Sequence, residues 1–180
     1  MSPNSEAVAE AAPTVTAPRV TVTPYRAADG REMVLLDPAR VGLDGVTQAD
    51  RVWEEYETLG PGWTLRVDGV VVGCAGIVRM RWPGVAHAWL LPSPDLPRYP
   101  KTMALAILQE FKELLARERF WRLECNVLQD FALGRRFAEW CGFQEEGILY
   151  FYGPKAEHMI RYALIYPEHL PDAVRARLAL

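Results

Sequence analysis

The sequence predicts an α/β domain whose mixed sheet is mostly antiparallel and is flanked by helices. Stretches in which apolar and polar residues alternate are typical of strands, and stretches in which apolar residues recur every three or four positions are typical of helices. Both patterns occur, in the order strand, helices, three strands, helix, strand, helix, two strands. The chain has 180 residues, the length of a single domain, and is 50% hydrophobic, which is sufficient for a buried core.

Charge and cysteine content exclude several classes of protein. The 20 Lys and Arg residues nearly balance the 23 Asp and Glu residues, and no basic block is present, so we expect no binding to duplex nucleic acid. No apolar run is long enough for a membrane span, and the N-terminus lacks the layout of a secretion signal. Cys74, Cys125 and Cys141 are widely spaced, which predicts neither disulfides nor a metal site and fits a cytoplasmic location.

The N-terminal part of the chain differs in composition from the rest. Residues 1–17 are small and polar, which predicts a disordered tail before a single domain over residues 18–180. The domain opens with a strand from Val20 to Tyr25, followed by a turn at Ala28-Asp29-Gly30. We expect short helical turns between Arg31 and Leu43, and the spacing of apolar residues predicts an amphipathic helix over residues 46–57.

Three antiparallel strands are predicted next. Trp63–Val67 alternates, and Asp68-Gly69 has the composition of a two-residue hairpin turn. The return strand, Val70–Val78, is almost entirely apolar or small, which indicates burial on both faces. A third strand, Val85–Leu91, completes the meander.

A helix of about five turns, with apolar residues from Met103 to Leu115, follows a proline-rich loop. The next strand, Trp121–Val127, should lie parallel to Val85–Leu91, because the helix connects them by a right-handed crossover. Asp130 is the predicted cap of a further helix that Gly142 ends in a left-handed conformation. The remaining expected elements are two strands and a short helix, over Gly147–Tyr152, His158–Ile165 and Leu170–Leu180.

This order of elements, together with the segment Phe137–Phe143 (FAEWCGF), resembles the GNAT superfamily of acyl-CoA-dependent N-acetyltransferases. The resemblance covers roughly residues 18–166 and is most specific at the end of that helix and the hairpin after it. A narrower likeness, to short GNAT-like proteins encoded by bacteriophages, depends on the layout of Asp68-Gly69, Gly73–Gly76 and Trp89. The resemblance implies that the two central parallel strands of the sheet splay apart.

The resemblance also implies acetyl-CoA as cofactor, with its pantetheine arm between the splayed strands and its pyrophosphate at the start of the long helix, where the dipole favours an anion. The residues implied to bind it are Leu91, Arg98, Tyr99, Lys101, Thr102 and Arg136. The family writes the phosphate loop as Arg/Gln-x-x-Gly-x-Gly/Ala. Both glycines are missing here and Pro100 removes a donor, so the alternative is a rigid loop with solvated charges. For Arg136 the alternative is a solvated helix face.

The catalytic acid departs from the family pattern as well. Many members carry a tyrosine on the helix after the fifth strand, but Ala138 stands near that position. Tyr150 is therefore a candidate acid, with Tyr152 beside it, although a strand tyrosine more often packs in the core or at its rim.

Two residues are candidates for the general base. His87 lies in the fourth strand and has a suitable pKa, whereas Glu124 lies in the fifth strand and could act through water. The competing interpretations are a satisfied sheet histidine and an ion pair between Glu124 and Arg122. The sequence does not show which face of each strand meets the cofactor, and Glu124 is slightly favoured.

The expected function is transfer of an acetyl group from acetyl-CoA to a primary amine. A small molecule or a modified nucleotide is the expected acceptor, and the sequence equally allows an antibiotic, a polyamine, a protein N-terminus or a lysine. A homodimer is also considered. One alternative is a GNAT-fold protein without catalysis that serves as a binding or virion-associated module, which the altered loop and the missing tyrosine favour. A generic α/β ligand-binding domain is a third interpretation, against which the Gly142-Phe143 ending argues.

Overall fold

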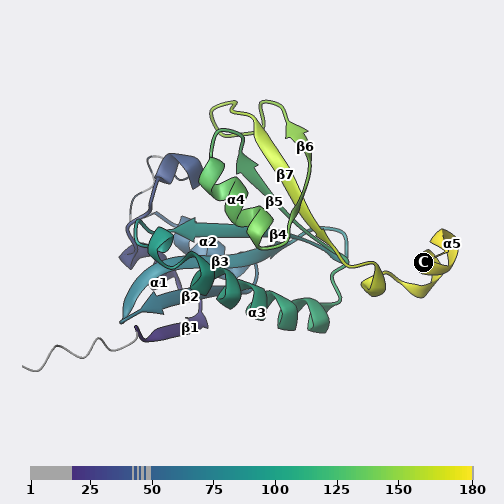
Figure 1. Cartoon of the computed structure of the whole chain (residues 1–180), viewed down its shortest axis with the longest axis horizontal. Helices are drawn as coiled ribbons and strands as arrows, with labels where there is room; N and C mark the ends of the chain where they lie inside the picture. The colour runs from purple at the N-terminus through teal and green to yellow at the C-terminus, as the bar shows by residue number, and fades with distance from the viewer. Residues whose placement is uncertain (1–17, 42, 44, 46, 48–49, 180) are drawn as a thin grey trace, which may run out of the picture.

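A computed structural model describes residues 18–41, 43, 45, 47 and 50–179. The predicted tail over residues 1–17 lies outside this part of the chain. The described strands form one seven-stranded sheet in the order β1-β2-β3-β4-β5-β7-β6 (Figure 1). The predicted fold class, a mostly antiparallel mixed sheet with flanking helices, is confirmed.

The N-terminal half of the sheet is antiparallel and contains the predicted meander. Its strands are β1 (Val20–Pro24), β2 (Gly62–Val67), β3 (Val70–Arg79) and β4 (Val85–Pro92). Asp68 and Gly69 join β2 to β3 with φ angles of 51° and 86°, as the predicted two-residue turn requires.

The C-terminal half consists of β5 (Arg122–Leu128), β7 (Met159–Ile165) and β6 (Gln144–Leu149). The prediction of a strand over Gly147–Tyr152 was wrong, because β6 begins and ends three residues earlier. A register shift between Glu145 and Gly147 occurs inside β6, so a glycine that indicates a strand end in sequence instead lies at a bulge.

The two halves meet in the parallel pair β4–β5. Only Val85, Ala86 and His87 have partners in β5, which are Arg122, Leu123 and Glu124. Beyond this point β4 stays paired with β3, and β5 stays paired with β7. The predicted splay between the central parallel strands is therefore present, and it leaves one edge of each strand unpaired.

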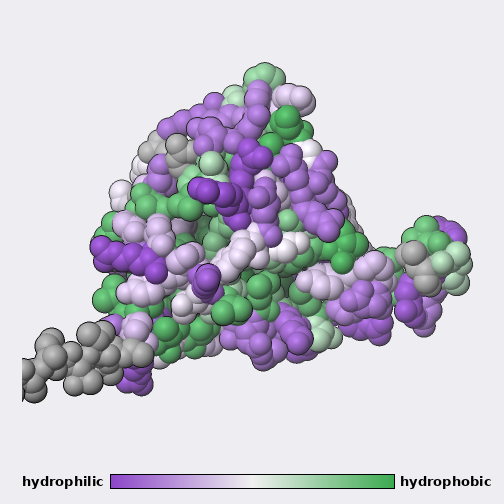
Figure 2. All heavy atoms as spheres, viewed as in Figure 1, coloured by the Kyte–Doolittle hydropathy of each residue, from purple (hydrophilic) through white to green (hydrophobic). Residues whose placement is uncertain are grey.

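Helices cover both faces of the sheet. One face carries α3 (Pro100–Glu118), preceded by the short turn η2 (Leu96–Arg98), and α4 (Ala132–Trp140) (Figure 1). In Figure 2, which views this face, hydrophobic residues reach the surface between α4 and α3. A large core cluster joins the helices to the sheet through apolar residues such as Ile77, Ala86, Met103, Phe111 and Leu123.

The opposite face carries α1 (Ala27–Glu32) and α2 (Val52–Leu59), and between them lies the turn η1 (Pro38–Val41). Their core contains Tyr25, Trp53, Val71, Cys74 and Leu91. Residues of β3 therefore enter both clusters, which confirms that this strand is buried on both faces.

The turn predicted at Ala28-Asp29-Gly30 was wrong, because these residues lie in α1. Gly30 has a packing role: a Cβ atom there would lie 2.5 Å from the Trp53 ring and 2.5 Å from the Tyr25 hydroxyl. The predicted helix over residues 46–57 begins only at Val52, while residues 46, 48 and 49 lie outside the described part of the chain.

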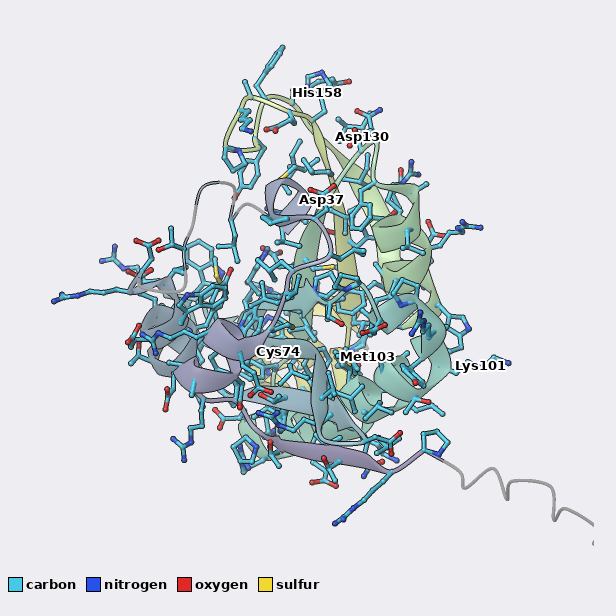
Figure 3. The ribbon with its side chains drawn as sticks, turned by 90° about the vertical axis from the view of Figure 1, so that its left-hand side faces the viewer. Asp37, Cys74, Lys101, Met103, Asp130 and His158 are labelled. Atoms are coloured by element: carbon cyan, nitrogen blue, oxygen red, sulfur yellow. The ribbon has the colours of Figure 1, made fainter. Side chains whose placement is uncertain are left out.

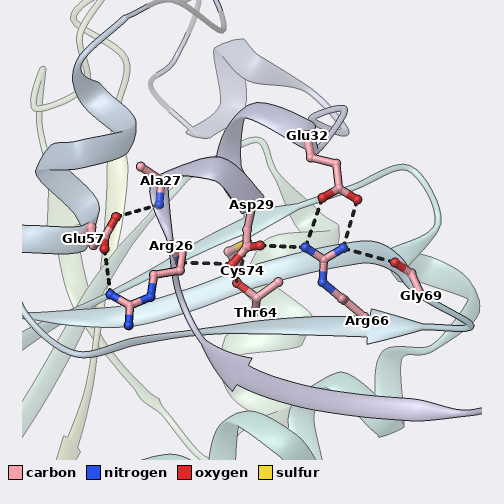
Figure 4. A network of polar contacts seen from close by, with 9 residues as sticks. All are labelled: Arg26, Ala27, Asp29, Glu32, Glu57, Thr64, Arg66, Gly69 and Cys74. Carbon is pink, nitrogen blue, oxygen red and sulfur yellow. Dashed lines mark hydrogen bonds and ion pairs between the residues drawn. The ribbon is translucent and has the colours of Figure 1, made fainter.

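Polar contacts fasten α1 to the sheet (Figure 4). Asp29, only 9% exposed, accepts hydrogen bonds from Nη2 of Arg66 at 2.6 Å, from the hydroxyl of Thr64 at 2.7 Å and from the amide of Arg26 at 3.0 Å. Because a buried carboxylate needs partners for its oxygens, this set fixes the position of α1 over β2.

The ends of the C-terminal elements differ slightly from the sequence prediction. Phe131, not Asp130, is the residue that precedes α4, and it makes no side-chain capping bond. Gly142 follows the helix with a φ of 91°, as predicted. After η3 (Pro167–His169) the chain forms the expected short helix, α5 (Asp172–Leu178).

No helix in the described ranges is long and apolar enough to span a bilayer.

Candidate functional site

A cavity of about 830 Å³ lies where β4 and β5 diverge. Successive residues of both strands line it, from His87 to Pro92 and from Glu124 to Leu128. Because successive strand residues point to opposite faces, the cavity opens through the sheet. Its size and its mostly apolar lining are typical of a small-molecule site.

Different elements contribute to the two sides of this cavity. On the side of α3 and α4 the lining is apolar, with Ile107, Phe111, Phe137 and Ala138 among the contributing residues. On the side of α1 and α2 it includes aromatic and polar groups, which are Tyr56, His87, Trp89, Glu124, Asn126 and Arg161, and the turn residues Trp82 and Tyr152 also line it. The first side suits a flexible apolar chain, and the second side can recognise a polar molecule.

His87 and Glu124 face each other at the last paired position of β4 and β5. Nδ1 of His87 lies 3.9 Å from Oε1 of Glu124. Burial lowers the pKa of His87 below its ordinary value of 6.5; the nearby carboxylate of Glu124 opposes this effect and the charge of Arg161 adds to it. The imidazole is therefore uncharged at neutral pH and can accept a proton.

The carboxylate of Glu124 is bound by two arginines. Nε of Arg122 donates to Oε2 at 2.8 Å, and Nη1 of Arg161 lies 3.4 Å from Oε1. Arg122 also donates to both carboxylate oxygens of Glu146. The ion pair with Arg122, the competing interpretation from the sequence, is thus formed, and both oxygens of Glu124 are occupied.

Trp89 lies between two tyrosines on this side. Its ring lies 5.5 Å from that of Tyr25 in an edge contact and 4.6 Å from that of Tyr56 in a tilted one. Its Nε1 atom is buried and has no hydrogen-bond partner among the described residues. Such an unpaired donor is unusual in a folded protein.

The start of α3 is built from prolines instead of glycines. Tyr99 precedes the helix and Pro100 is its first residue, so one amide donor is absent. The side chain of Arg98 is 76% exposed and forms an ion pair of 3.0 Å with Asp95. Lys101 is exposed and points outward, whereas Met103 points into the core (Figure 3).

Of the residues predicted to bind the cofactor, Leu91 lines the cavity. Arg98, Tyr99, Lys101 and Thr102 lie together around the start of α3 but outside the lining. Arg136 is exposed on α4 and also lies outside it. The structure therefore provides a largely apolar slot between β4 and β5, and a charged but glycine-free start of α3.

Of the predicted catalytic residues, His87 and Glu124 are brought together and Tyr150 is not. Tyr150 follows the end of β6, is 68% exposed and packs edge-on against His158. Its neighbour Tyr152 lines the cavity instead.

The sequence interpretation missed Arg161, Tyr56 and the contribution of Trp89. Arg161 comes opposite Asn126 only because β7 pairs with β5, a pairing between strands that are not consecutive in the chain. The alternation in β7 places Arg161 and Met159 on one face, which is the only local signal for its direction.

The cysteines of the cavity are poor nucleophiles. Cys125 and Cys141 line it, and burial raises the pKa of each thiol to about 12, so both stay protonated at neutral pH. Within the described residues, no three His, Cys, Asp or Glu side chains gather in a way that could hold a metal ion.

No family model matches the sequence, and no curated protein matches it. Solved structures do resemble the fold. A putative acetyltransferase from Salmonella typhimurium, solved with its cofactor acetyl-CoA, shares 20% identity, with 86% of this chain and 98% of that chain covered and a TM-score of 0.66.

Two further structures match over similar lengths. An acetyltransferase of the GNAT family from Bacillus anthracis has 12% identity and a TM-score of 0.65, with 83% and 96% of the two chains covered. The ribosomal-protein-S5-alanine acetyltransferase from Vibrio fischeri also has 12% identity, with a TM-score of 0.61 and coverages of 84% and 96%. The chain thus has the fold of GNAT acetyltransferases, as the resemblance in sequence predicted.

Proposed function

We propose that this protein transfers an acetyl group from acetyl-CoA to a primary amine. The observation that supports this most is the cavity that passes through the sheet at the splay of β4 and β5, with His87 and Glu124 in its lining at the last paired position of the two strands. When bound, acetyl-CoA would supply a thioester: its carbonyl carbon would bond to the amine nitrogen, the bond to sulfur would break, and the departing thiolate would take up the second proton that the nitrogen loses.

The residues of the chain have separate tasks in this proposal. The apolar lining on the side of α3 and α4 holds the arm and excludes water. The imidazole of His87 takes the proton of the incoming ammonium, because it is uncharged at neutral pH. Glu124, held by Arg122 and Arg161, orients His87 and stabilises the imidazolium. Arg98 and Lys101 contact the phosphates at the start of α3.

A thermal-shift titration tests cofactor binding, because a ligand that binds only the folded state raises the melting temperature with its concentration. We expect a shift with acetyl-CoA and CoA, and mass spectrometry of the purified protein to detect retained CoA. Release of free thiol from acetyl-CoA on addition of amines then tests transfer. No shift at millimolar acetyl-CoA, together with no thiol release, would contradict the proposal.

The start of α3 favours a second candidate, a GNAT-fold module that binds without catalysis. Pro100 lacks the backbone N–H that another residue would offer to a phosphate, and the guanidinium of Arg98 is already paired with the carboxylate of Asp95. Binding of CoA without thiol release from any amine would favour this candidate. The narrower likeness to phage-encoded proteins stays a prediction.

A further inference from the structure

We propose that the acceptor is an α-amino acid with an apolar or aromatic side chain, and that Arg161 binds its carboxylate. This inference rests on the proposed acetyl transfer and names the class of amine. It depends on four groups on the side of α1 and α2, which are Glu124, Asn126, Arg161 and the aromatic pair Tyr56 and Trp89.

The charges of the cavity match those of a zwitterion. Among the described lining residues, Glu124 is the only carboxylate and Arg161 the only guanidinium, while His87 is uncharged at neutral pH. A polyamine carries several cations, which would meet a single carboxylate already bound by two arginines. An α-amino acid carries one ammonium and one carboxylate, so its carboxylate can pair with Arg161 while its ammonium lies beside the uncharged His87, the proposed base.

The guanidinium of Arg161 is held in place with donors to spare. Nε donates to Oδ1 of Asn126 at 3.1 Å, and Nη1 lies 3.4 Å from Oε1 of Glu124. Nη2 makes no hydrogen bond within the described part of the chain, and 27% of the side chain is exposed at the cavity. A guanidinium fixed on two sides can bind a carboxylate with little loss of side-chain entropy.

The surroundings of these charges are apolar and aromatic. Tyr56 and Trp89 lie in ring contact on one side, and Met80, Trp82, Tyr152 and Met159 are further residues of the lining. Trp82 and Tyr152 are 59% and 57% exposed, so they lie where the cavity opens to solvent. This lining suits the side chain of an apolar or aromatic amino acid.

Matched pairs of amines that differ only in the carboxylate test the proposal. L-phenylalanine, L-leucine and L-methionine are compared with 2-phenylethylamine, isoamylamine and 3-(methylthio)propylamine. We expect kcat/KM for at least one amino acid to exceed that of its decarboxylated partner by roughly 10–100-fold, the range expected for a hydrogen bond between charged groups. Calorimetry with CoA present should show the same order of affinity.

Two variants separate recognition from general damage to the cluster. Arg161→Gln should bring the ratio within each pair to about one, because it removes the carboxylate partner. Arg122→Gln removes the other arginine from Glu124 but lies outside the cavity lining, so the ratio should persist.

The outcomes for the two proposals are distinct. If every decarboxylated amine is acetylated with the same kcat/KM as its amino acid, this inference is overturned and acetyl transfer stands. If no amine is acetylated, the proposed function fails, but calorimetry still decides the inference. The inference is overturned if every decarboxylated amine binds with the same affinity as its amino acid. A ratio that Arg161→Gln leaves unchanged would also overturn it.

Discussion

The imidazole of His87 and the buried carboxylate of Glu124 meet at the last paired position of β4 and β5, with Nδ1 and Oε1 3.9 Å apart. Glu124 is 7% exposed and bound by two arginines, whereas His87 is uncharged at neutral pH. The two residues that the sequence offers as alternative bases therefore form one unit, in which His87 has the free capacity to accept a proton.

Replacing His87 with Gln should lower kcat/KM for acetyl transfer by ~10²–10⁴-fold, the usual loss when a general base is removed. Glu124→Gln should have a smaller effect, because the imidazole remains. Affinity for CoA, measured by calorimetry, should stay unchanged in the His87 variant. A larger loss in Glu124→Gln than in His87→Gln would instead assign proton transfer to Glu124.

The lowered pKa of His87 also predicts a pH dependence of stability. Above pH 6.5, its ordinary pKa, the side chain is uncharged in both states and contributes nothing to this dependence. Below that value the unfolded chain binds the proton first, so the free energy of unfolding falls as the pH drops toward the folded pKa. Glu124 and Arg161 face the imidazole and carry opposite charges, and both residues remain when His87 is replaced.

His87→Gln should therefore lose less stability than the wild type between about pH 7.5 and pH 5.5, measured by denaturant unfolding. His158 and His169 are present in both proteins, so the difference reports on His87 alone. A variant as pH-dependent as the wild type would contradict the lowered pKa.

The start of α3 can be tested by replacing Arg98 and Lys101 together with Ala. Affinity for CoA should fall by roughly 1–3 kcal/mol for each charged hydrogen bond that is lost. Lys112→Ala, at an exposed position further along the same helix, is the matched control and should leave the affinity unchanged. Calorimetry at two salt concentrations provides the measurement. Equal affinity in the double variant would remove this segment from the cofactor site.

Asp29→Asn should lower the free energy of unfolding by about 2–3 kcal/mol, because it leaves Arg66 with a weakened partner in a part-buried position. Glu32→Gln is the matched control, since Glu32 also pairs with Arg66 but its side chain is 52% exposed. Such an exposed pair is worth about 1 kcal/mol or less. Equal losses in the two variants, measured by denaturant unfolding, would show that burial of Asp29 adds nothing.

Most of the sheet could be predicted from the sequence because its strands have local signals. The alternation in β2, the Asp68-Gly69 turn and the apolar run of β3 each depend on neighbouring residues only. Gly30 was misleading for a physical reason. A glycine in a short polar stretch indicates a turn, but this glycine lies in the helix α1, where the absence of a side chain leaves room for the ring of Trp53.

The candidate site was predictable only in part, because it is assembled from strands that are distant in the chain. His87, Leu91 and Glu124 were identified and all line the cavity. Which faces they share depends on the register between β4 and β5, and the position of Arg161 depends on the pairing of β7 with β5. Neither register is contained in the local pattern of residues.

The pairing of β4 with β5 at only three positions also has a consequence for the order in which the protein folds. The β2–β4 meander and the β6–β7 hairpin are made from contacts close in sequence, which form quickly. The pairing of β4 with β5 forms later, because these strands are separated in the chain by α3. The cavity between β4 and β5 then exists only after the two halves of the sheet have docked. A molecule bound there interacts with the final state and not with the halves, so we expect it to slow unfolding while leaving the rate of folding almost unchanged.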